Sequence, residues 1–297
     1  MNLLKRIIRK AFSTMGYEIR RKQVGQRTDP KDLEVYHKHY PHASIVNQRF
    51  YNIGAGTFRH PYWKNIDLAS EWYAQSQVES DMINYDLFSL EPLPLPDNCA
   101  EVVYTSHTVE HVNDQAAQNM FRESYRILKK GGIFRLTTPD VDLYYKAYRN
   151  NDRDFYWWIE LYSTREVTEK IGIYPFDQCS LAQVFLFSFA THTSQCVIDT
   201  TVDKFSDEDI EVAFSVMAYE EALEHFIARC TLEAQRRFPG YHMNWWNWKK
   251  AERMLREAGF IEIYKSGYGQ SVSPVMRNTQ LFDKQDPKDS LYVEAVK

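Results

Sequence analysis

RFYNIGAG, residues 49–56, is the stretch that decides the fold class. Its first five residues are the first strong strand signal in the chain, because aromatic and β-branched side chains surround Asn52. They run directly into Gly54, Ala55 and Gly56. Glycines at the carboxyl end of a parallel strand allow a sharp turn, which brings the backbone close to a ligand. We therefore predict a strand followed by a ligand-binding turn, although such a turn alone is more often structural.

Strand and helix signals alternate on either side of this stretch. Further strands are expected at residues 63–67, 82–87, 101–105 and 133–138. A helix capped by Asn113 or Asp114 is expected to end at the cations and glycines of residues 129–132. A largely helical, aromatic segment fills residues 143–239, and a helix at 245–258 and strands at 260–264 and 291–296 follow it. This order predicts an α/β fold: a Rossmann-like, mostly parallel sheet with helices on both faces and a helical, aromatic-rich insertion before the last strands.

Composition excludes several classes of protein. The net charge of −4 and the pI near 6.2 provide no basic field for a phosphate backbone, so no nucleic acid is expected as a partner. The four cysteines form no CxxC pair, so we expect neither a disulfide framework nor a zinc site, and we assign no metal. Cysteine usage of this kind fits a reducing cytoplasm. No apolar run approaches the ~18–20 residues of a membrane span.

The N-terminus has a different character. Residues 1–22 carry seven Lys and Arg side chains against Glu18 alone, and their apolar residues recur at helical spacing. One interpretation is a helix on an anionic membrane surface, which would place the protein at the inner face of the membrane. The other is a helix packed on the body of the protein or on a second subunit of a homo-oligomer. Pattern alone does not separate the two.

Two acidic residues end the strands that follow the glycine turn. Asp67 ends the second strand, where a carboxylate can accept hydrogen bonds from both hydroxyls of a ribose. Asp86 ends the third strand, where an acceptor can receive the exocyclic amine of adenine. Because these strands end at one edge of the sheet, the pattern predicts a nucleoside ligand there.

Seven motifs occur in an order seen in class I methyltransferases that depend on S-adenosylmethionine (SAM): Asn52–Gly56, Trp63–Asp67, Asn84–Leu87, Pro94–Asn98, Thr105–His111, Ile127–Gly132 and Thr138–Asp140. The chain resembles this family and, more narrowly, a bacterial subgroup encoded with surface-polysaccharide genes. The resemblance covers residues 50–141 and 241–297. There is one departure, since residues 57–62 replace both a fuller glycine motif and the helix before the second strand.

The resemblance implies that SAM is the cofactor. Gly54 and Gly56 would flank its methionine portion, Asp67 would bind the ribose and Asp86 would face the adenine. The implied cofactor-binding residues are Asn52, Gly54, Ala55, Gly56, Asp67, Leu68, Asp86, Leu87, Ser106 and His107. His107 would lie where the transferred methyl group and its acceptor meet.

Methyl transfer to a sugar hydroxyl requires removal of a proton, by a positioned base or with the help of a metal. The candidates for this step are His107, His111, Asp140 and His242, with His192 as a further histidine. A carbohydrate or glycan-precursor acceptor suits the flat faces of Trp157, Trp158, Phe176, Trp245, Trp246 and Trp248, but aromatic residues at helical spacing are more often core. We predict O-methylation of a sugar of a bacterial surface glycan or its precursor. The alternatives are methylation of another small metabolite and a non-catalytic binding protein on a degenerate methyltransferase fold.

The same observations divide the chain into four regions. Residues 1–40 would form the basic amphipathic helix and its connection, and residues 41–145 the SAM-binding core. Residues 146–240 would form the helical insertion that caps the substrate. Residues 241–297 would return to the core with a helix and the closing strands.

Overall fold

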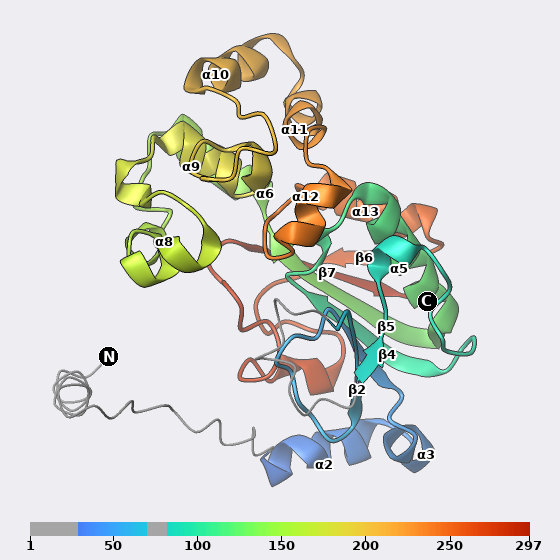
Figure 1. Cartoon of the computed structure of the whole chain (residues 1–297). Coiled ribbons are helices and arrows are strands. Elements are labelled where there is room, and N and C mark those ends of the chain that lie inside the picture. The colour runs from blue at the N-terminus through green and yellow to red at the C-terminus, as the bar shows by residue number, and fades with distance from the viewer. Residues whose placement is uncertain (1–28, 70–81) are drawn as a thin grey trace, which may run out of the picture.

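A seven-stranded sheet in the order β3-β2-β1-β4-β5-β7-β6 forms the centre of the computed structural model, which describes residues 29–69 and 82–297 (Figure 1). Its strands are β1 (Phe50–Ile53), β2 (Trp63–Asp67), β3 (Met82–Asn84), β4 (Ala100–Ser106), β5 (Leu128–Pro139), β6 (Glu262–Lys265) and β7 (Ser290–Val296). The first five pair in parallel, and β7 runs antiparallel to both of its neighbours. The predicted Rossmann-like, mostly parallel sheet is confirmed. The helix predicted within residues 1–22 lies outside the described residues.

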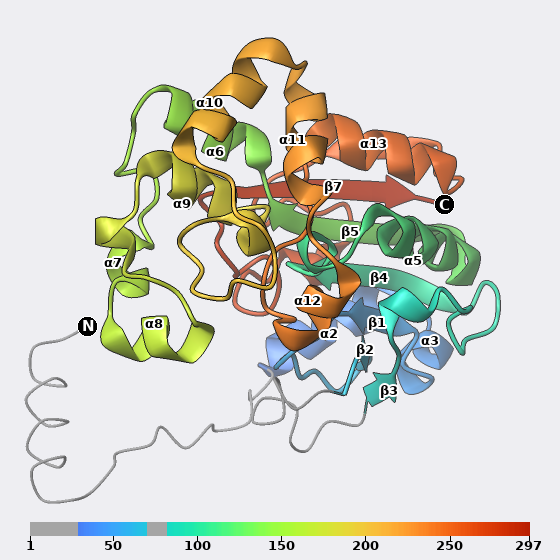
Figure 2. The ribbon, with the colours of Figure 1, turned by 45° about the horizontal axis from the view of Figure 1, so that its top comes forward.

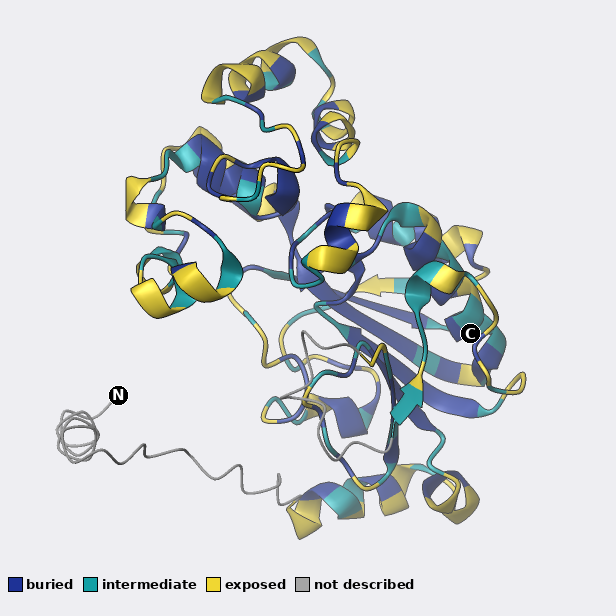
Figure 3. Ribbon diagram, in the orientation of Figure 1, coloured by how far each residue is buried: buried dark blue, intermediate teal, exposed yellow. Residues whose placement is uncertain are grey.

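Helices cover both faces of the sheet (Figure 2). On one face α5 (Asp114–Ile127) and α13 (Trp248–Glu257) pack on the strands through a core that includes Phe121, Phe134 and Trp246. On the other face α2 (Pro30–His39), α3 (His42–Val46) and η5 (Pro274–Arg277) pack around Phe50 and Trp63. Because both faces are covered, every residue of β1 is buried, as are all but the last of β4 (Figure 3).

A helical segment is inserted between β5 and α13. It comprises α6 (Val141–Arg149), α7 (Ile159–Tyr162), α8 (Arg165–Ile171), η3 (Phe176–Gln178), α9 (Leu181–Phe187), η4 (Thr191–Thr193), α10 (Asp207–Val216), α11 (Tyr219–Ile227) and α12 (Leu232–Arg237). The segment has an aromatic core of its own. Phe176 and Trp245 are buried in that core and Trp246 is buried beneath α13, so packing accounts for these three members of the aromatic block. The division of the chain into four regions stays a prediction.

Two element boundaries differ from those predicted. The helix expected to end at residues 129–132 ends at Ile127, because Leu128 is already extended and pairs with Ala100 as the start of β5. Gly131 adopts φ +76° there and donates to the Lys297 carbonyl at 2.7 Å, so the glycines serve the strand and not a helix end. The third predicted strand is shorter, and Asp86 instead begins the turn η1 (Leu87–Ser89).

None of the helices within residues 29–69 and 82–297 combines the length and the apolar character needed to cross a membrane.

Candidate active site

A cavity of about 530 Å³ lies at the carboxyl ends of β1, β2 and β4. Its walls are the turns that follow these strands and β3, together with α12 and the loop at residues 281–285. The lining includes all ten residues predicted to bind the cofactor: Asn52, Gly54, Ala55, Gly56, Asp67, Leu68, Asp86, Leu87, Ser106 and His107. In open α/β sheets, ligands bind at this edge. The structure therefore brings the predicted residues together, and their individual roles stay predictions.

The turn after β1 requires glycine at position 54. Gly54 adopts φ +69°, and a Cβ atom there would lie 2.1 Å from Thr108 Oγ1. Thr108 is held in place because its hydroxyl donates to the Ser106 carbonyl at 3.2 Å. The Gly54 amide donates to the Ile66 carbonyl at 2.9 Å, which ties the turn to β2. The turn can therefore pass this close to Thr108 only if residue 54 has no side chain.

Asp67 connects the end of β2 to the glycine turn. Its Oδ2 accepts from the Gly56 amide at 2.8 Å, and its Oδ1 accepts from the Leu68 amide at 2.8 Å. The short connection before β2 is also anchored, since Asn65 Nδ2 donates to the Phe58 carbonyl at 2.7 Å. The missing helix thus leaves a packed loop that still presents Asp67 to the cavity.

Asp86 follows β3, the strand beside β2, where the cavity meets α12. Its Oδ1 accepts from the Phe88 amide at 2.9 Å, which caps η1. Arg236 Nη2 of α12 lies 3.4 Å from its Oδ2, so the helical insertion reaches across this end of the cavity. Leu87, Phe88 and Pro239 add apolar surface there. A carboxylate beside apolar side chains provides suitable surroundings for a purine base.

His107 lies at the carboxyl end of β4 and lines the cavity. It adopts φ +48°, an uncommon conformation for a residue with a side chain. Its Nδ1 lies 3.3 Å from Glu110 Oε1, and its Nε2 lies 2.9 Å from Ser290 Oγ. Burial alone would lower the pKa of His107, but the Glu110 carboxylate outweighs burial and raises it. The imidazole is therefore oriented between a carboxylate and a hydroxyl at the edge of the cavity.

Glu110, which the sequence did not single out as a candidate, lies beside His107. Only 1% of it is exposed, and its Oε2 accepts from Thr138 Oγ1 at 3.0 Å. Burial would raise the pKa of Glu110, but the neighbouring His107 lowers it to about 2. The signal was present in the sequence, because the 3₁₀ turn η2 (Val109–His111) follows His107 and brings residues three apart together.

His111 and His242 lie face to edge, with their ring centres 4.8 Å apart. His111 lines the cavity, whereas His242 lies behind it, next to α9 and η4. Burial and the neighbouring His111 lower the pKa of His242 to about 4. His192 is buried and bonds Gln235 Oε1 at 2.7 Å, so it serves packing of the insertion.

Comparison with known proteins finds a likeness over part of the chain. A family model described as a methyltransferase domain matches residues 61–136, which include Asp67, Asp86 and His107. Over these residues the chain is similar to that family. A curated relative from Mycolicibacterium smegmatis, named a probable S-adenosylmethionine-dependent methyltransferase, is 40% identical over 52 residues. That match covers 18% of this chain and spans only 20% of the relative's length.

Solved structures of methyltransferases are similar at low identity. A SAM-dependent methyltransferase from Mesorhizobium loti shares 13% identity over 84% of this chain and 90% of its own, with a TM-score of 0.36. A possible histamine N-methyltransferase from Thermotoga maritima shares 14% identity over 90% of this chain and 87% of its own, with a TM-score of 0.38.

The likeness to a methyltransferase domain implies SAM as the cofactor, and the size and lining of the cavity suit that molecule. Its volume lies within the range of ~300–1,000 Å³ that is typical of small-molecule sites. A glycine turn without side chains stands at one wall, and the carboxylates of Asp67 and Asp86 stand at the ends of successive strands. These donors and acceptors suit, in order, an amino-acid backbone, a ribose and an adenine.

Asp140 is not among the residues that line the cavity, and its role as a catalytic candidate stays a prediction. Its Oδ1 accepts from the Asp142 amide at 3.1 Å and caps α6. Burial, with a smaller contribution from Asp142, raises the pKa of Asp140 to about 6 from its ordinary 3.8. Lys265 opposes this shift. The helix cap needs only an oxygen that accepts a hydrogen bond, so the negative charge of the buried carboxylate lowers the stability of the folded protein without improving the cap.

Replacing Asp140 with asparagine is expected to stabilise the protein above pH 6. Because its pKa is raised on folding, the folded state holds the proton more tightly, and stability is lost as the pH rises from about 4 to about 6. Asparagine keeps the cap and removes this loss, by up to about 3 kcal/mol. Urea unfolding of both proteins between pH 4 and pH 8 measures the difference. Parallel stability curves across that range would show that Asp140 ionises normally.

Proposed function

We propose that the protein is a SAM-dependent methyltransferase that methylates a hydroxyl group of a sugar in a bacterial surface glycan or its precursor. The observation that carries this proposal is the meeting of the glycine turn, Asp67 and the His107–Glu110 pair at one cavity. The methyltransferase-domain match over residues 61–136 supports the reaction class. The motif order shared with methyltransferases of surface-polysaccharide gene clusters supports the sugar acceptor.

Different parts of the cofactor bind to successive segments at the edge of the sheet. Gly54 and Gly56 present backbone to the methionine portion, because neither has a side chain and both adopt positive φ. Asp67 holds the turn and accepts from the ribose hydroxyls, since a carboxylate can accept up to about four hydrogen bonds. Asp86 and Leu87 receive the adenine at the wall shared with α12.

When bound, SAM supplies a methyl group on a sulfonium, which a nucleophile displaces in line. The protein must hold the acceptor hydroxyl in that line, exclude water and take up its proton. We assign the last task to His107, which lines the cavity, because Glu110 faces its Nδ1 and its Nε2 contacts the Ser290 hydroxyl. An acceptor hydroxyl that replaces Ser290 as the partner of Nε2 would pass its proton to His107. Glu110 would then stabilise the imidazolium, as a carboxylate does for other catalytic histidines.

Methyl transfer can be tested with SAM that carries a labelled methyl group and a panel of nucleotide sugars, lipid-linked sugars and unrelated metabolites. We expect label in a sugar fraction. In His107→Asn the rate should be at least ~100-fold lower than in the wild type, because a general base contributes about 10²–10⁴-fold. Asparagine tolerates the positive φ of this position. His39→Gln, on the exposed end of α2, is the matched control.

The outcomes separate the parts of the proposal. Label in a non-sugar metabolite would overturn the acceptor. A His107→Asn rate equal to that of the control would overturn the base. Binding of S-adenosylhomocysteine (SAH) without transfer to any member of the panel would favour a non-catalytic protein.

A further inference from the structure

Three potential metal ligands lie close together beside the part of the cavity that His111 lines. Glu110 and His111 come from η2, and His242 comes from the segment between α12 and α13. One carboxylate oxygen and one nitrogen of each imidazole lie within 4.8 Å of one another. The two histidines are far apart in the sequence, so only the fold brings them together.

Both imidazoles are oriented by the main chain. His111 Nδ1 lies 2.9 Å from the Tyr241 carbonyl oxygen, and His242 Nδ1 lies 2.6 Å from the Ser188 carbonyl oxygen. A carbonyl can only accept, so each Nδ1 carries the proton and each Nε2 keeps a lone pair. Histidines that bind metals are held in this way, with the distal nitrogen donating to a carbonyl or carboxylate. His111 Nε2 lies 3.9 Å from Glu110 Oε1, so the lone pair and the carboxylate meet.

Glu110 provides an independent indication of a ligand. Its side chain is 2% exposed, and no donor among the described residues makes a hydrogen bond with its Oε1. His107 Nδ1 lies 3.3 Å from this oxygen, but the contact lacks the geometry of a hydrogen bond. A buried carboxylate oxygen that lacks a donor costs free energy, and such atoms are rare in folded proteins. A cation at Oε1 would supply the missing partner.

We propose that Glu110 Oε1, His111 Nε2 and His242 Nε2 bind one divalent ion of the first transition series. Two imidazole nitrogens and one carboxylate oxygen suit zinc, cobalt, manganese or ferrous iron, whereas magnesium and calcium prefer oxygen ligands alone. Ligands about 2.1 Å from an ion lie about 3.4 Å apart at a tetrahedral site and about 4.2 Å apart on opposite sides of the ion, so the widest pair must approach by about 0.6–1.4 Å. This approach requires the two imidazoles to shift while Nδ1 of each stays near its carbonyl partner.

The site would open toward the acceptor. Three protein ligands leave coordination positions free, and His111 itself lines the cavity. The class of ligand for those positions is an oxygen, from water or from the acceptor hydroxyl, whose proton a divalent ion makes easier to remove. Binding of the ion is independent of the proposed function, so each can fail alone.

Titration of the full chain with cobalt, after removal of metals with a chelator, tests the proposal. We expect one equivalent to bind per chain, with the visible absorption of a cobalt ion held by nitrogen and oxygen ligands. Calorimetry with zinc and manganese should give the same stoichiometry. In Glu110→Gln and in His242→Gln the affinity for cobalt should fall at least ~100-fold, whereas His39→Gln should bind as the wild type does.

Each variant is also titrated with SAH, which separates loss of the metal site from loss of the cofactor site. Should Glu110→Gln fail to fold, His111→Gln carries the same test, because the His111 side chain is 22% exposed. Absence of stoichiometric cobalt binding to the wild type would overturn the proposal. Equal cobalt affinity in wild type, His242→Gln and His111→Gln would overturn it as well.

Discussion

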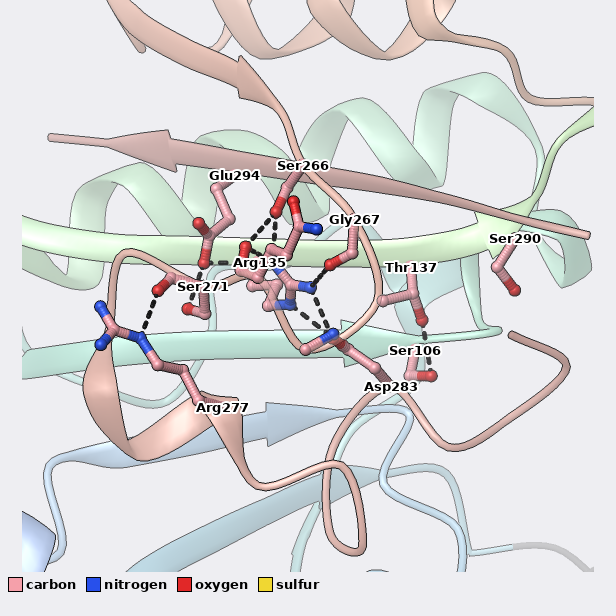
Figure 4. Close-up of polar contacts among 12 residues, drawn as sticks. Ser106, Arg135, Thr137, Ser266, Gly267, Ser271, Arg277, Asp283, Ser290 and Glu294 are labelled. Atoms are coloured by element: carbon pink, nitrogen blue, oxygen red, sulfur yellow. Dashed lines mark hydrogen bonds and ion pairs between the residues drawn. The ribbon is translucent and has the colours of Figure 1, made fainter. Parts of the chain in front are cut away.

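Replacing Arg135 with methionine is expected to lower the free energy of unfolding by about 3–5 kcal/mol, because two buried carboxylates lose their cation. Arg135 of β5 is fully buried, and its Nε donates to Asp283 Oδ1 at 3.0 Å (Figure 4). Its Nη1 lies 3.2 Å from Glu294 Oε1 of β7. Burial opposes the charge on Arg135, but Asp283 outweighs burial and raises its pKa. Methionine has a similar volume, so the loss reports the missing charge and hydrogen bonds and not a cavity.

The same ion pair anchors one wall of the cavity. Asp283 lies beside Leu281, Lys284 and Gln285, which line the cavity, and Arg135 Nη2 also donates to the Gly267 carbonyl at 2.9 Å. The Arg135→Met variant should therefore also bind SAH more weakly. Urea unfolding measures the stability. Arg165→Met is the matched control, since the Arg165 side chain is 88% exposed and its pair with Glu169 should contribute well under about 1 kcal/mol.

A second substitution separates charge from geometry in this network. Asp283→Asn in the Arg135→Met background should recover part of the lost stability, because one buried, unpaired charge is removed. A loss under about 1 kcal/mol in Arg135→Met would mean that the two carboxylates are protonated or hydrated and that the ion pair does not hold this loop.

Gly54→Ala is expected to weaken SAH binding at least ~100-fold, because the turn after β1 must move to admit a side chain. The new Cβ would lie 2.1 Å from Thr108 Oγ1 and 2.5 Å from Thr108 Cγ2, which is too close for a carbon atom and atoms to which it is not bonded. The turn itself is held by the bonds of Gly54 to Ile66 and of Gly56 to Asp67. Displacing it would move both the methionine end and the ribose end of the site. Calorimetric titration with SAH measures the loss.

Gly131→Ala controls for the backbone strain in this experiment. Gly131 adopts φ +76°, close to that of Gly54, but no atom of the described chain lies within 4 Å of its added Cβ. Its substitution should cost about 1–2 kcal/mol of stability and leave SAH affinity unchanged. Wild-type SAH affinity in Gly54→Ala would contradict the placement of the cofactor against this turn.

Local patterns were sufficient to predict the sheet edge. Residues 50–53 and 63–67 form strands as expected, since their aromatic and β-branched side chains are buried between layers of helix. Gly54, Asp67 and Asp86 could be placed at one cavity because parallel strands end at a common edge. The secondary structure of residues 128–132 was predicted wrongly. Cations followed by glycines are typical of a helix end, and only the pairing of these residues with β4 makes them part of a strand.

Tertiary contacts decided the remainder. Glu110 gained its importance from burial between His107 and Thr138, and burial is not visible in sequence spacing. His242 meets Glu110 and His111 only because the insertion returns its last segment to η2. For the same reason the absence of CxxC pairs led to no metal being assigned, although the candidate ligands here are a glutamate and two histidines. Asp140 ends the expected strand, but the start of α6 takes up its carboxylate.

The most direct test of the central claim is calorimetric titration of the wild-type chain with SAH, alongside Asp67→Ala. We expect one site per chain in the wild type. In the variant the affinity should be at least ~100-fold lower, because charge-assisted hydrogen bonds to the ribose and the anchor of the glycine turn are lost together. Absence of SAH binding to a folded wild-type chain, or equal binding by both proteins, would show that the cofactor does not bind at Asp67.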